Sequence, residues 1–256
     1  MNRRKILLGL ASIAVISKPA LSAVQQPYKV SLVAGGRTEG LWQAGILVEM
    51  EKNWKTYWRV PGDAGIPPQF DWTGSQNVAS VDVGFPIPTR FQDITGEAIG
   101  YHDRVLFPVD VKVVDATLPV ALKLSMFFAV CEVVCIPANV TVTSRLETAS
   151  SSPLIAQWRA RVPKSGEGAT PIVSGARLEM EAGKPMLVLK VSQPLQDIFV
   201  EADSAAYFGK PQFDKVSGEA WLPVANIKDA ASLHNLMLKL TLSFGDSGIE
   251  QSVAVT

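Results

Sequence analysis

The sequence contains very little cysteine and histidine. Its 256 residues include two cysteines, Cys131 and Cys135, and two histidines, His102 and His234. A structural zinc site takes four such ligands, and no Cys or His spacing is repeated near the cysteines, so a zinc site is not expected. Two thiolates alone could still bind a soft ion such as Cu(I).

The sequence also lacks a charge excess of either sign and long apolar runs in its main part. It has 24 basic and 24 acidic side chains, so nothing indicates nucleic acid as a partner. After residue 23, no segment has the roughly 18 uninterrupted apolar residues of a membrane-spanning helix. No phosphate-binding loop or Gly-x-Ser-x-Gly motif is present, which leaves no sign of a nucleotide-binding or hydrolase site.

Residues 1–23 have the features of a secretory signal. Residues 1–5 are basic, residues 6–17 are mostly apolar, and small residues end the segment at Ala23. Because the apolar run is short for the roughly 30 Å of a bilayer core, we expect a cleaved signal peptide rather than an anchoring helix. The mature protein is then exported, to the periplasm in a Gram-negative bacterium, where closely spaced cysteines can form a disulfide.

Most of the remaining chain predicts short β-strands. Alternating or β-branched runs bounded by turn residues occur at 30–33, 41–50, 78–83, 105–114, 120–130, 140–146, 176–180, 186–191, 198–201, 219–224 and 236–244. Nineteen glycines and 17 prolines separate them, a pattern typical of β-sandwiches. We therefore expect a β domain at 24–150 and a second one at 171–256.

A short helix and a linker are expected at 151–170, between these domains. Ser152 can cap the helix and Pro153 suits its first position. The apolar residues on one helical face are Leu154, Ile155, Trp158 and Val162. Pro163 ends the pattern, and the Gly-rich residues 164–171 follow as the linker.

The two cysteines lie only four residues apart, and this spacing requires a turn. A disulfide holds its two Cα atoms about 4.4–6.8 Å apart, whereas an extended strand would separate Cys131 and Cys135 by about 13 Å. We therefore expect residues 131–137 to form a bend between two strands. A ring this small stabilises a fold by only about 2 kcal/mol. Redox exchange, a structural clip and metal binding all remain open at this point.

Several motifs resemble a known family. They are GYHDRVLFPV at 100–109, CEVVCIP at 131–137 and NWKTYWRVPGDAGIPP at 53–68, followed by Asp71 and Trp72. In this order they resemble the N-terminal periplasmic domain of the thiol:disulfide interchange protein DsbD. They are more similar still to the related ScsB proteins, which are linked to suppression of copper sensitivity. The resemblance spans about 40–148, and residues from 170 onward fit a second β domain of ScsB-type proteins loosely.

The resemblance implies an immunoglobulin-like β-sandwich, and a fold of two such domains, in which Cys131 and Cys135 match the redox-active pair. It also implies a thiol–disulfide oxidoreductase without a dissociable cofactor. Its electrons would come from a membrane-embedded donor of the DsbD/CcdA type or a thioredoxin-like protein, and its clients would be oxidised periplasmic proteins. The cysteines are closer together than in DsbD, and we expect a free-standing form. The alternative is a non-catalytic periplasmic binding protein with a structural disulfide or a Cu(I)-binding thiol pair.

The resemblance suggests a residue that caps the disulfide, and general thiol chemistry suggests residues that tune it. In the family an aromatic residue on a loop covers the disulfide, and Phe91, within 85–96, is the matching candidate. Tyr101, His102 or Asp103 near the sulfurs would change the thiol pKa, and Glu132 would raise it by charge repulsion. The aromatic residues Trp54, Tyr57, Trp58 and Trp72 are expected to pack in the core rather than form a binding surface.

Overall fold

A computed structural model describes residues 26–62, 65–93, 96–146, 152–227 and 230–256. The predicted signal segment, residues 1–23, lies outside these ranges. The described chain is mainly β-structure, which confirms the predicted fold class. Within these ranges, no helix is long and apolar enough to cross a membrane.

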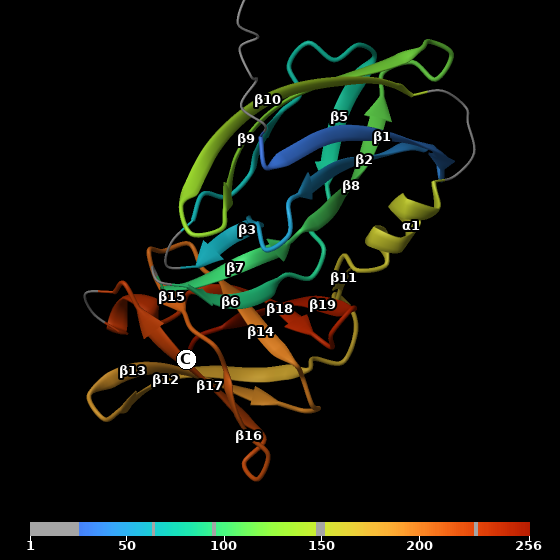
Figure 1. Cartoon of the computed structure of the whole chain (residues 1–256). Helices are drawn as coiled ribbons and strands as arrows, with labels where there is room; N and C mark the ends of the chain where they lie inside the picture. Colours follow the sequence, from blue (N-terminus) through green and yellow to red (C-terminus); the bar gives the residue numbers. More distant parts are fainter. Residues whose placement is uncertain (1–25, 63–64, 94–95, 147–151, 228–229) are drawn as a thin grey trace, which may run out of the picture.

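The first ten strands form one sandwich, called here the first sandwich (Figure 1). Its strands are β1 (Tyr28–Thr38), β2 (Leu41–Met50), β3 (Lys55–Gly62), β4 (Gln69–Asp71), β5 (Val78–Val83), β6 (Thr89–Asp93), β7 (Gly96–His102), β8 (Arg104–Val113), β9 (Val120–Cys131) and β10 (Cys135–Leu146). One sheet has the order β1-β2-β8-β5. The other, called the site sheet, has the order β10-β9-β3-β7-β6, with β4 beside β9.

The remaining strands form the second sandwich. They are β11 (Lys164–Ser165), β12 (Val173–Glu181), β13 (Lys184–Val191), β14 (Asp197–Glu201), β15 (Tyr207–Phe208), β16 (Gln212–Asp214), β17 (Glu219–Ala225), β18 (Met237–Ser243) and β19 (Gly248–Ala254). Its sheets have the orders β11-β19-β18-β14 and β12-β13-β17-β15, with β16 beside β17. The boundaries at 150 and 171 stay predictions.

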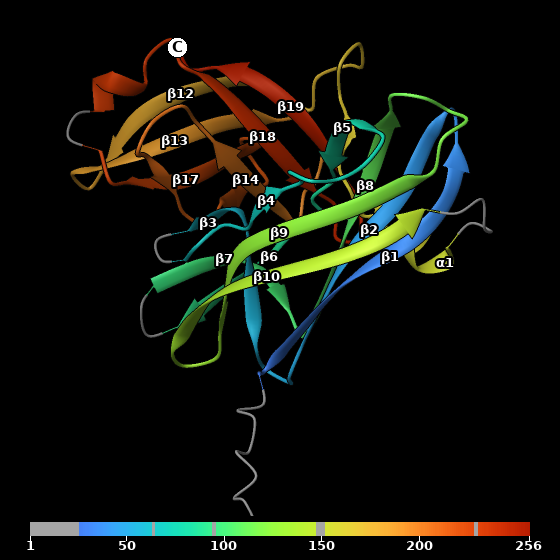
Figure 2. The same cartoon turned by 90° about the horizontal axis from the view of Figure 1, so that it is seen from above.

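Alternation along β9 explains why the site sheet has two different faces. Leu122, Leu124, Met126 and Phe128 are buried in the main core of the first sandwich, whereas Lys123 between them is exposed. Such a period of two places successive side chains on opposite faces of a sheet. The long β9–β10 hairpin ends in a turn that lies near β6 and β7, away from the helix (Figure 2).

The predicted helix forms but is shorter than expected. Helix α1 (Pro153–Arg159) begins after Ser152, whose side chain accepts a hydrogen bond from the Ile155 amide at 3.5 Å. Ile155 is buried beside Leu106. Val162 lies beyond the helix end, so its predicted place on the helical face is wrong.

Several strands were not expected from the sequence. The predicted strands at 41–50 and 78–83 coincide with β2 and β5. In contrast, β3, β6 and β7 of the site sheet fall in segments rich in Gly, Pro or charged residues. Part of the predicted linker is also a strand, since β11 pairs with β19.

The second sandwich completes the core of the first. Phe199 of β14 is buried in the main core of the first sandwich, and its ring lies 5.6 Å from that of Trp58. Beside them, the Arg59 guanidinium bonds Glu201 and Glu250 of the second sandwich, each at 2.6 Å. The two sandwiches are therefore joined by buried apolar packing as well as by ion pairs.

We expect Phe199→Ala to lower the free energy of unfolding by about 3–5 kcal/mol, because it removes a buried aromatic ring and leaves a cavity. Urea unfolding followed by tryptophan fluorescence measures this change. Phe213→Ala is the matched control: this ring is 37% exposed, so its removal should change stability by less than about 0.5 kcal/mol. Equal losses in the two variants would contradict the role given to Phe199.

Candidate functional site

The two cysteines form a disulfide at the closed end of the β9–β10 hairpin. Cys131 ends β9, Cys135 begins β10, and the two are directly paired, with their Cα atoms 4.1 Å apart. The turn contains only residues 132–134. The predicted bend over 131–137 is therefore too long, since Ile136 and Pro137 already pair with β9. Antiparallel pairing places both sulfurs on the same face of the site sheet.

The two halves of the disulfide differ in exposure. Cys131 is 3% exposed, whereas Cys135 is exposed. The neighbouring turn residues Val133 and Val134 are 69% and 71% exposed. A thiolate from another protein can therefore approach the Cys135 side of the bond more readily than the Cys131 side.

A row of four residues crosses the site sheet at the level of the disulfide. Cys135 pairs with Cys131, Cys131 pairs with Lys55, and Lys55 pairs with His102. Directly opposed residues on antiparallel strands have Cβ atoms about 4.5–5.5 Å apart and share a face. The buried Lys55 side chain thus lies next to Cys131, on the side opposite Cys135.

A small apolar cluster covers Cys131 on this face. We call it the outer cluster; it contains Tyr57, Ala98, Ala129 and Cys131, with Ile66 and Phe91 packed against them. The outer cluster and the main core lie on opposite sides of the site sheet. Trp58 and Val130, which neighbour Tyr57 and Cys131 in the sequence, are buried in the main core. Phe91, the candidate cap, is thus placed at the cluster that contains Cys131. Its action as a cap stays a proposal.

Tyr57 contacts the other sulfur. Its hydroxyl lies 3.1 Å from the Cys135 Sγ. Because a disulfide sulfur carries no hydrogen, the hydroxyl is the donor in this state. The tyrosine ring is fixed by the chain at Gly65, where a Cβ atom would lie 2.5 Å from the ring. A residue with a side chain at that position would displace Tyr57.

His102 and Lys55 both lie against Phe91. The Phe91 and His102 ring centroids are 4.6 Å apart, and the Lys55 ammonium is 5.4 Å from the Phe91 centroid. Burial lowers the pKa of His102 below its ordinary 6.5, and Lys55 adds to this effect while Asp103 opposes it. The imidazole at this site is therefore held toward its neutral form.

The other residues suggested by the sequence lie in different places. Tyr101 is buried in the main core, where its hydroxyl donates to the Pro86 carbonyl at 2.8 Å, so the structure does not bring it to the sulfurs. Asp103 adopts a φ of 57° in a turn and accepts a hydrogen bond from the Asn53 amide at 2.8 Å. Glu132 is exposed in the turn between the cysteines.

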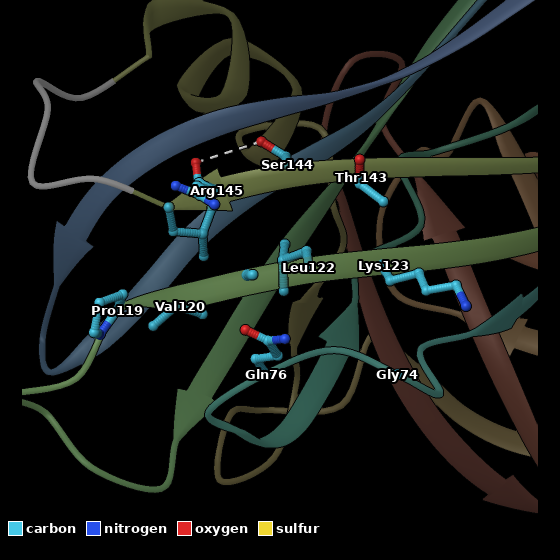
Figure 3. Close-up of a pocket in the computed structure, with 11 residues that line it drawn as sticks. Gly74, Gln76, Pro119, Val120, Leu122, Lys123, Thr143, Ser144 and Arg145 are labelled. Carbon is cyan, nitrogen blue, oxygen red and sulfur yellow. Dashed lines mark hydrogen bonds between the residues drawn. The ribbon is translucent and has the colours of Figure 1, made fainter.

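A surface hollow lies at the other end of the same hairpin. It is lined by residues around Gln76, Val120 and Arg145 (Figure 3). Val120 is eleven residues before Cys131 along β9, so this hollow is separate from the disulfide. Within the part of the chain that the structure describes, no three His, Cys, Asp or Glu side chains gather as a metal site would.

The sequence did not point to Lys55 or to Tyr57 as site residues. Both lie on β3, a strand that was not expected, and Tyr57 was expected to be a core residue. It is indeed buried, at 1% exposure, but in the outer cluster. The one available signal was the position of Lys55 inside the apolar segment WKTYW. Lysine is rarely buried unless it is paired, so a lysine in such a segment can mark a functional site.

Comparisons with known proteins identify proteins that are similar to this chain. The model of the family "Thiol:disulfide interchange protein DsbD, N-terminal" matches residues 19–147. The crystal structure of the N-terminal periplasmic domain of ScsB from Proteus mirabilis has a TM-score of 0.67 and 21% sequence identity. That match covers 93% of this chain and 96% of the other, and at this identity it shows a shared fold.

The other comparisons add little. A protein of unknown function from Porphyromonas gingivalis W83 matches with a TM-score of 0.23 and 11% identity, over 90% of this chain and 99% of the other. A TM-score this low supports no structural argument. A search of curated proteins finds no significant match.

We expect an NMR titration to give His102 a pKa below 6.5, and Phe91→Ala to raise it toward that value by exposing the imidazole to water. The unfolded chain then binds the proton first as pH falls. The contribution of His102 to the free energy of unfolding therefore decreases below about pH 6.5. His234→Gln assigns the two histidine signals. A His102 pKa that Phe91→Ala leaves unchanged would contradict the packing described.

Proposed function

Because the chain belongs to the family of N-terminal domains of the thiol:disulfide interchange protein DsbD, we propose that it relays reducing equivalents through Cys131 and Cys135. One observation carries the proposal: the disulfide joins an exposed cysteine to a buried one beside a buried lysine. Such a bond can be opened from one side, and its inner thiolate is formed on a residue that pairs directly with a lysine.

Reduction of the domain takes two exchange steps. A donor thiolate attacks the Cys135 sulfur, the disulfide breaks, and Cys131 leaves as a thiolate with the bonding electron pair. A second donor thiolate then attacks the donor sulfur of the mixed disulfide, and Cys135 leaves. The donor has become a disulfide, and the domain has gained two electrons and, after protonation, two thiols.

Transfer to a client reverses this order. The Cys135 thiolate attacks the client disulfide and releases one client thiolate. Cys131 then attacks the Cys135 sulfur, the domain disulfide re-forms, and the second client thiolate leaves. In this scheme Cys135 meets every partner and Cys131 only resolves the mixed disulfide. The asymmetry of exposure supports these roles.

Lys55 and Tyr57 support the two thiolates differently. Lys55 pairs directly with Cys131, and its ammonium lies 5.4 Å from the centroid of Phe91, which packs on the same outer cluster. A cation near a sulfur favours a thiolate over a thiol. The Tyr57 hydroxyl is within hydrogen-bonding distance of Cys135 and can donate to its thiolate. We also retain Glu132 as a proposed opposing influence, since a carboxylate near the sulfurs raises a thiol pKa.

The family and the similar ScsB domain, which is periplasmic, support a proposal for the partners and the location. We propose a periplasmic protein whose donor is a membrane-embedded protein of the DsbD/CcdA type or a thioredoxin-like protein. Its clients are oxidised periplasmic proteins. The exposed apolar residues Val133, Val134 and Ile136 beside Cys135 form the surface that these partners would contact.

The alternative function is a binding protein in which the disulfide is a structural clip or the thiols bind Cu(I). The hairpin is already held by twelve paired positions from Val120 to Cys131. A further bond closing a ring of about five residues adds only about 2 kcal/mol. This small gain favours exchange over a clip, and measured redox behaviour separates the two.

We expect the Cys131–Cys135 couple to be reversible at a potential near that of thioredoxin-type donors, about −270 mV. The measurement is equilibration of the mature protein against glutathione and dithiothreitol buffers, followed by thiol trapping. A potential below about −300 mV would identify a structural clip. Tight Cu(I) binding that is lost in either Cys→Ser variant, without reversible exchange, would favour the metal-binding alternative.

Single-cysteine variants test the assigned roles in the same proposal. Cys131→Ser leaves the exposed Cys135, which should form a stable mixed disulfide with an oxidised partner. Cys135→Ser leaves the buried Cys131, which should form little. The opposite preference would reverse the roles of the two cysteines.

We expect Lys55→Met to raise the pKa of the Cys131 thiol by about one unit or more, because it removes an adjacent positive charge while keeping the side-chain length. Thiolate absorbance in the Cys135→Ser background isolates this thiol. Lys52→Met is the matched control, since Lys52 is exposed and lies outside the site sheet. Equal Cys131 pKa values in the two variants would remove Lys55 from the mechanism.

A further inference from the structure

Strand β6 lies between β7 and the strands of the second sandwich (Figure 1). Two consecutive residues on it face opposite ways. Phe91 packs on the outer cluster that contains Cys131. The side chain of Arg90 is 5% exposed and points into the second sandwich. Anything that holds Arg90 therefore also holds Phe91.

Arg90 makes several contacts with the second sandwich through one guanidinium group. Its Nε lies 3.0 and 3.1 Å from the two carboxylate oxygens of Asp197, and its Nη2 donates to the Ile198 carbonyl at 2.8 Å. A longer bond of 3.4 Å reaches the Phe208 carbonyl, and the Phe199 ring centroid is 4.9 Å from the guanidinium carbon. The rigid planar fork of arginine makes such a set directional.

Glu97 extends this arrangement to the neighbouring strand β7. Arg90 Nη1 bonds the Glu97 carboxylate at 2.5 Å, and the Tyr207 hydroxyl of the second sandwich donates to the same carboxylate oxygen. Glu97 is only 9% exposed. The end of the site sheet nearest Phe91 is thus bonded to the second sandwich through two buried charged residues.

The position of β6 in the sheet gives these contacts a role. Among the described strands it pairs only with β7, over five residues, so it is a short edge strand. A short edge strand that is paired on one side only opens locally at a low cost in free energy. The contacts of Arg90 add support from one face of the sheet.

We propose that the second sandwich holds β6 through Arg90 and thereby keeps Phe91 over Cys131, so that only Cys135 is open to partners. This inference rests on the proposed exchange function, to which it adds a role for the second sandwich. Arg90 and Asp197 act as positioning residues. A Cys131 thiolate shielded in this way attacks only the mixed disulfide at Cys135, and external disulfides do not reach it.

The same face of the interface offers a matched comparison. Asp197 and Glu201 both lie on β14, and each bonds an arginine of the site sheet. Asp197 bonds Arg90 on β6, whereas Glu201 bonds Arg59 on β3, which lies in the interior of the sheet. General loosening of the interface should affect both pairs, whereas the proposed hold on β6 involves Asp197 and not Glu201.

The test measures the alkylation rate of Cys131 by N-ethylmaleimide in the full chain carrying Cys135→Ser. Asp197→Asn should raise this rate by at least about tenfold, because local opening of β6 becomes easier, whereas Glu201→Gln should raise it by less than about twofold. The alkylation rate depends on the accessibility of the sulfur and on the fraction of thiolate. Rates measured over a range of pH separate these two effects. Equal effects of the two variants, or no effect of Asp197→Asn, would overturn the proposal.

A second background shows whether the effect is specific to Cys131. In Cys131→Ser, alkylation of Cys135 should be the same with and without Asp197→Asn, since Cys135 is already exposed. A similar increase at both cysteines would overturn the proposal by indicating general unfolding. If the Asp197→Asn variant does not fold, Arg90→Lys replaces it. This variant keeps the positive charge but loses the planar guanidinium group, and it should raise the alkylation rate at Cys131 alone.

This experiment does not depend on a physiological partner. If the reduction potential shows that the disulfide is a structural clip, the alkylation rates can still show that Arg90 holds β6. If the couple is reversible, the alkylation rates can still show that Arg90 does not hold β6. Failure of the proposed hold on β6 and failure of the exchange function are therefore distinguished.

Discussion

The pairing register of β9 with its two neighbours is the constraint on which the site depends. It places Cys131 opposite Cys135 on one side and opposite Lys55 on the other. Side chains alternate along a strand, so a slip of one residue would turn Cys131 into the main core. The same slip would bring Val130 to the outer face. The disulfide, the buried lysine and the packing of Phe91 on the outer cluster thus all require one register.

That register is stable because the site sheet is covered on both faces near the cysteines. On its inner side Trp58 packs on Phe199, which the second sandwich contributes. On its outer side Phe91 and Ile66 close over Tyr57. A reactive sulfur held on a rigid strand end keeps a defined position for exchange, which a sulfur on a loose loop would not. Packing by the second sandwich therefore supports the proposed chemistry.

The sequence predicted the parts of the molecule whose signals are local. Alternation defined β2 and β5, and Ser152 with Pro153 marked the start of α1. Strand β3 was missed because its Pro-Gly end and its lysine obscure the alternation. Consequently Lys55 and Tyr57 could not be assigned to the site. The resemblance to a known family supplied the cysteine pair, which composition and spacing left open among three interpretations.

The remaining features depend on contacts between distant residues. Tyr101 and His102 are adjacent and therefore face opposite sides of β7, and only the fold shows that His102 is on the side of the disulfide. Arg90 and Asp197 are 107 residues apart, and neither has a local pattern that predicts the other. Pairs of this kind become visible only when both sandwiches are placed together.

The asymmetry of the site argues for exchange as the proposed use of the disulfide. Cys135 is exposed beside Val133 and Val134, whereas Cys131 is buried in the outer cluster. A clip needs no such difference, because its bond only has to close the turn of a hairpin that is already paired over twelve positions. Exchange does need it, since a partner must reach one sulfur while the other stays in place to resolve the mixed disulfide. The placement of the two cysteines therefore suits exchange better than a permanent clip.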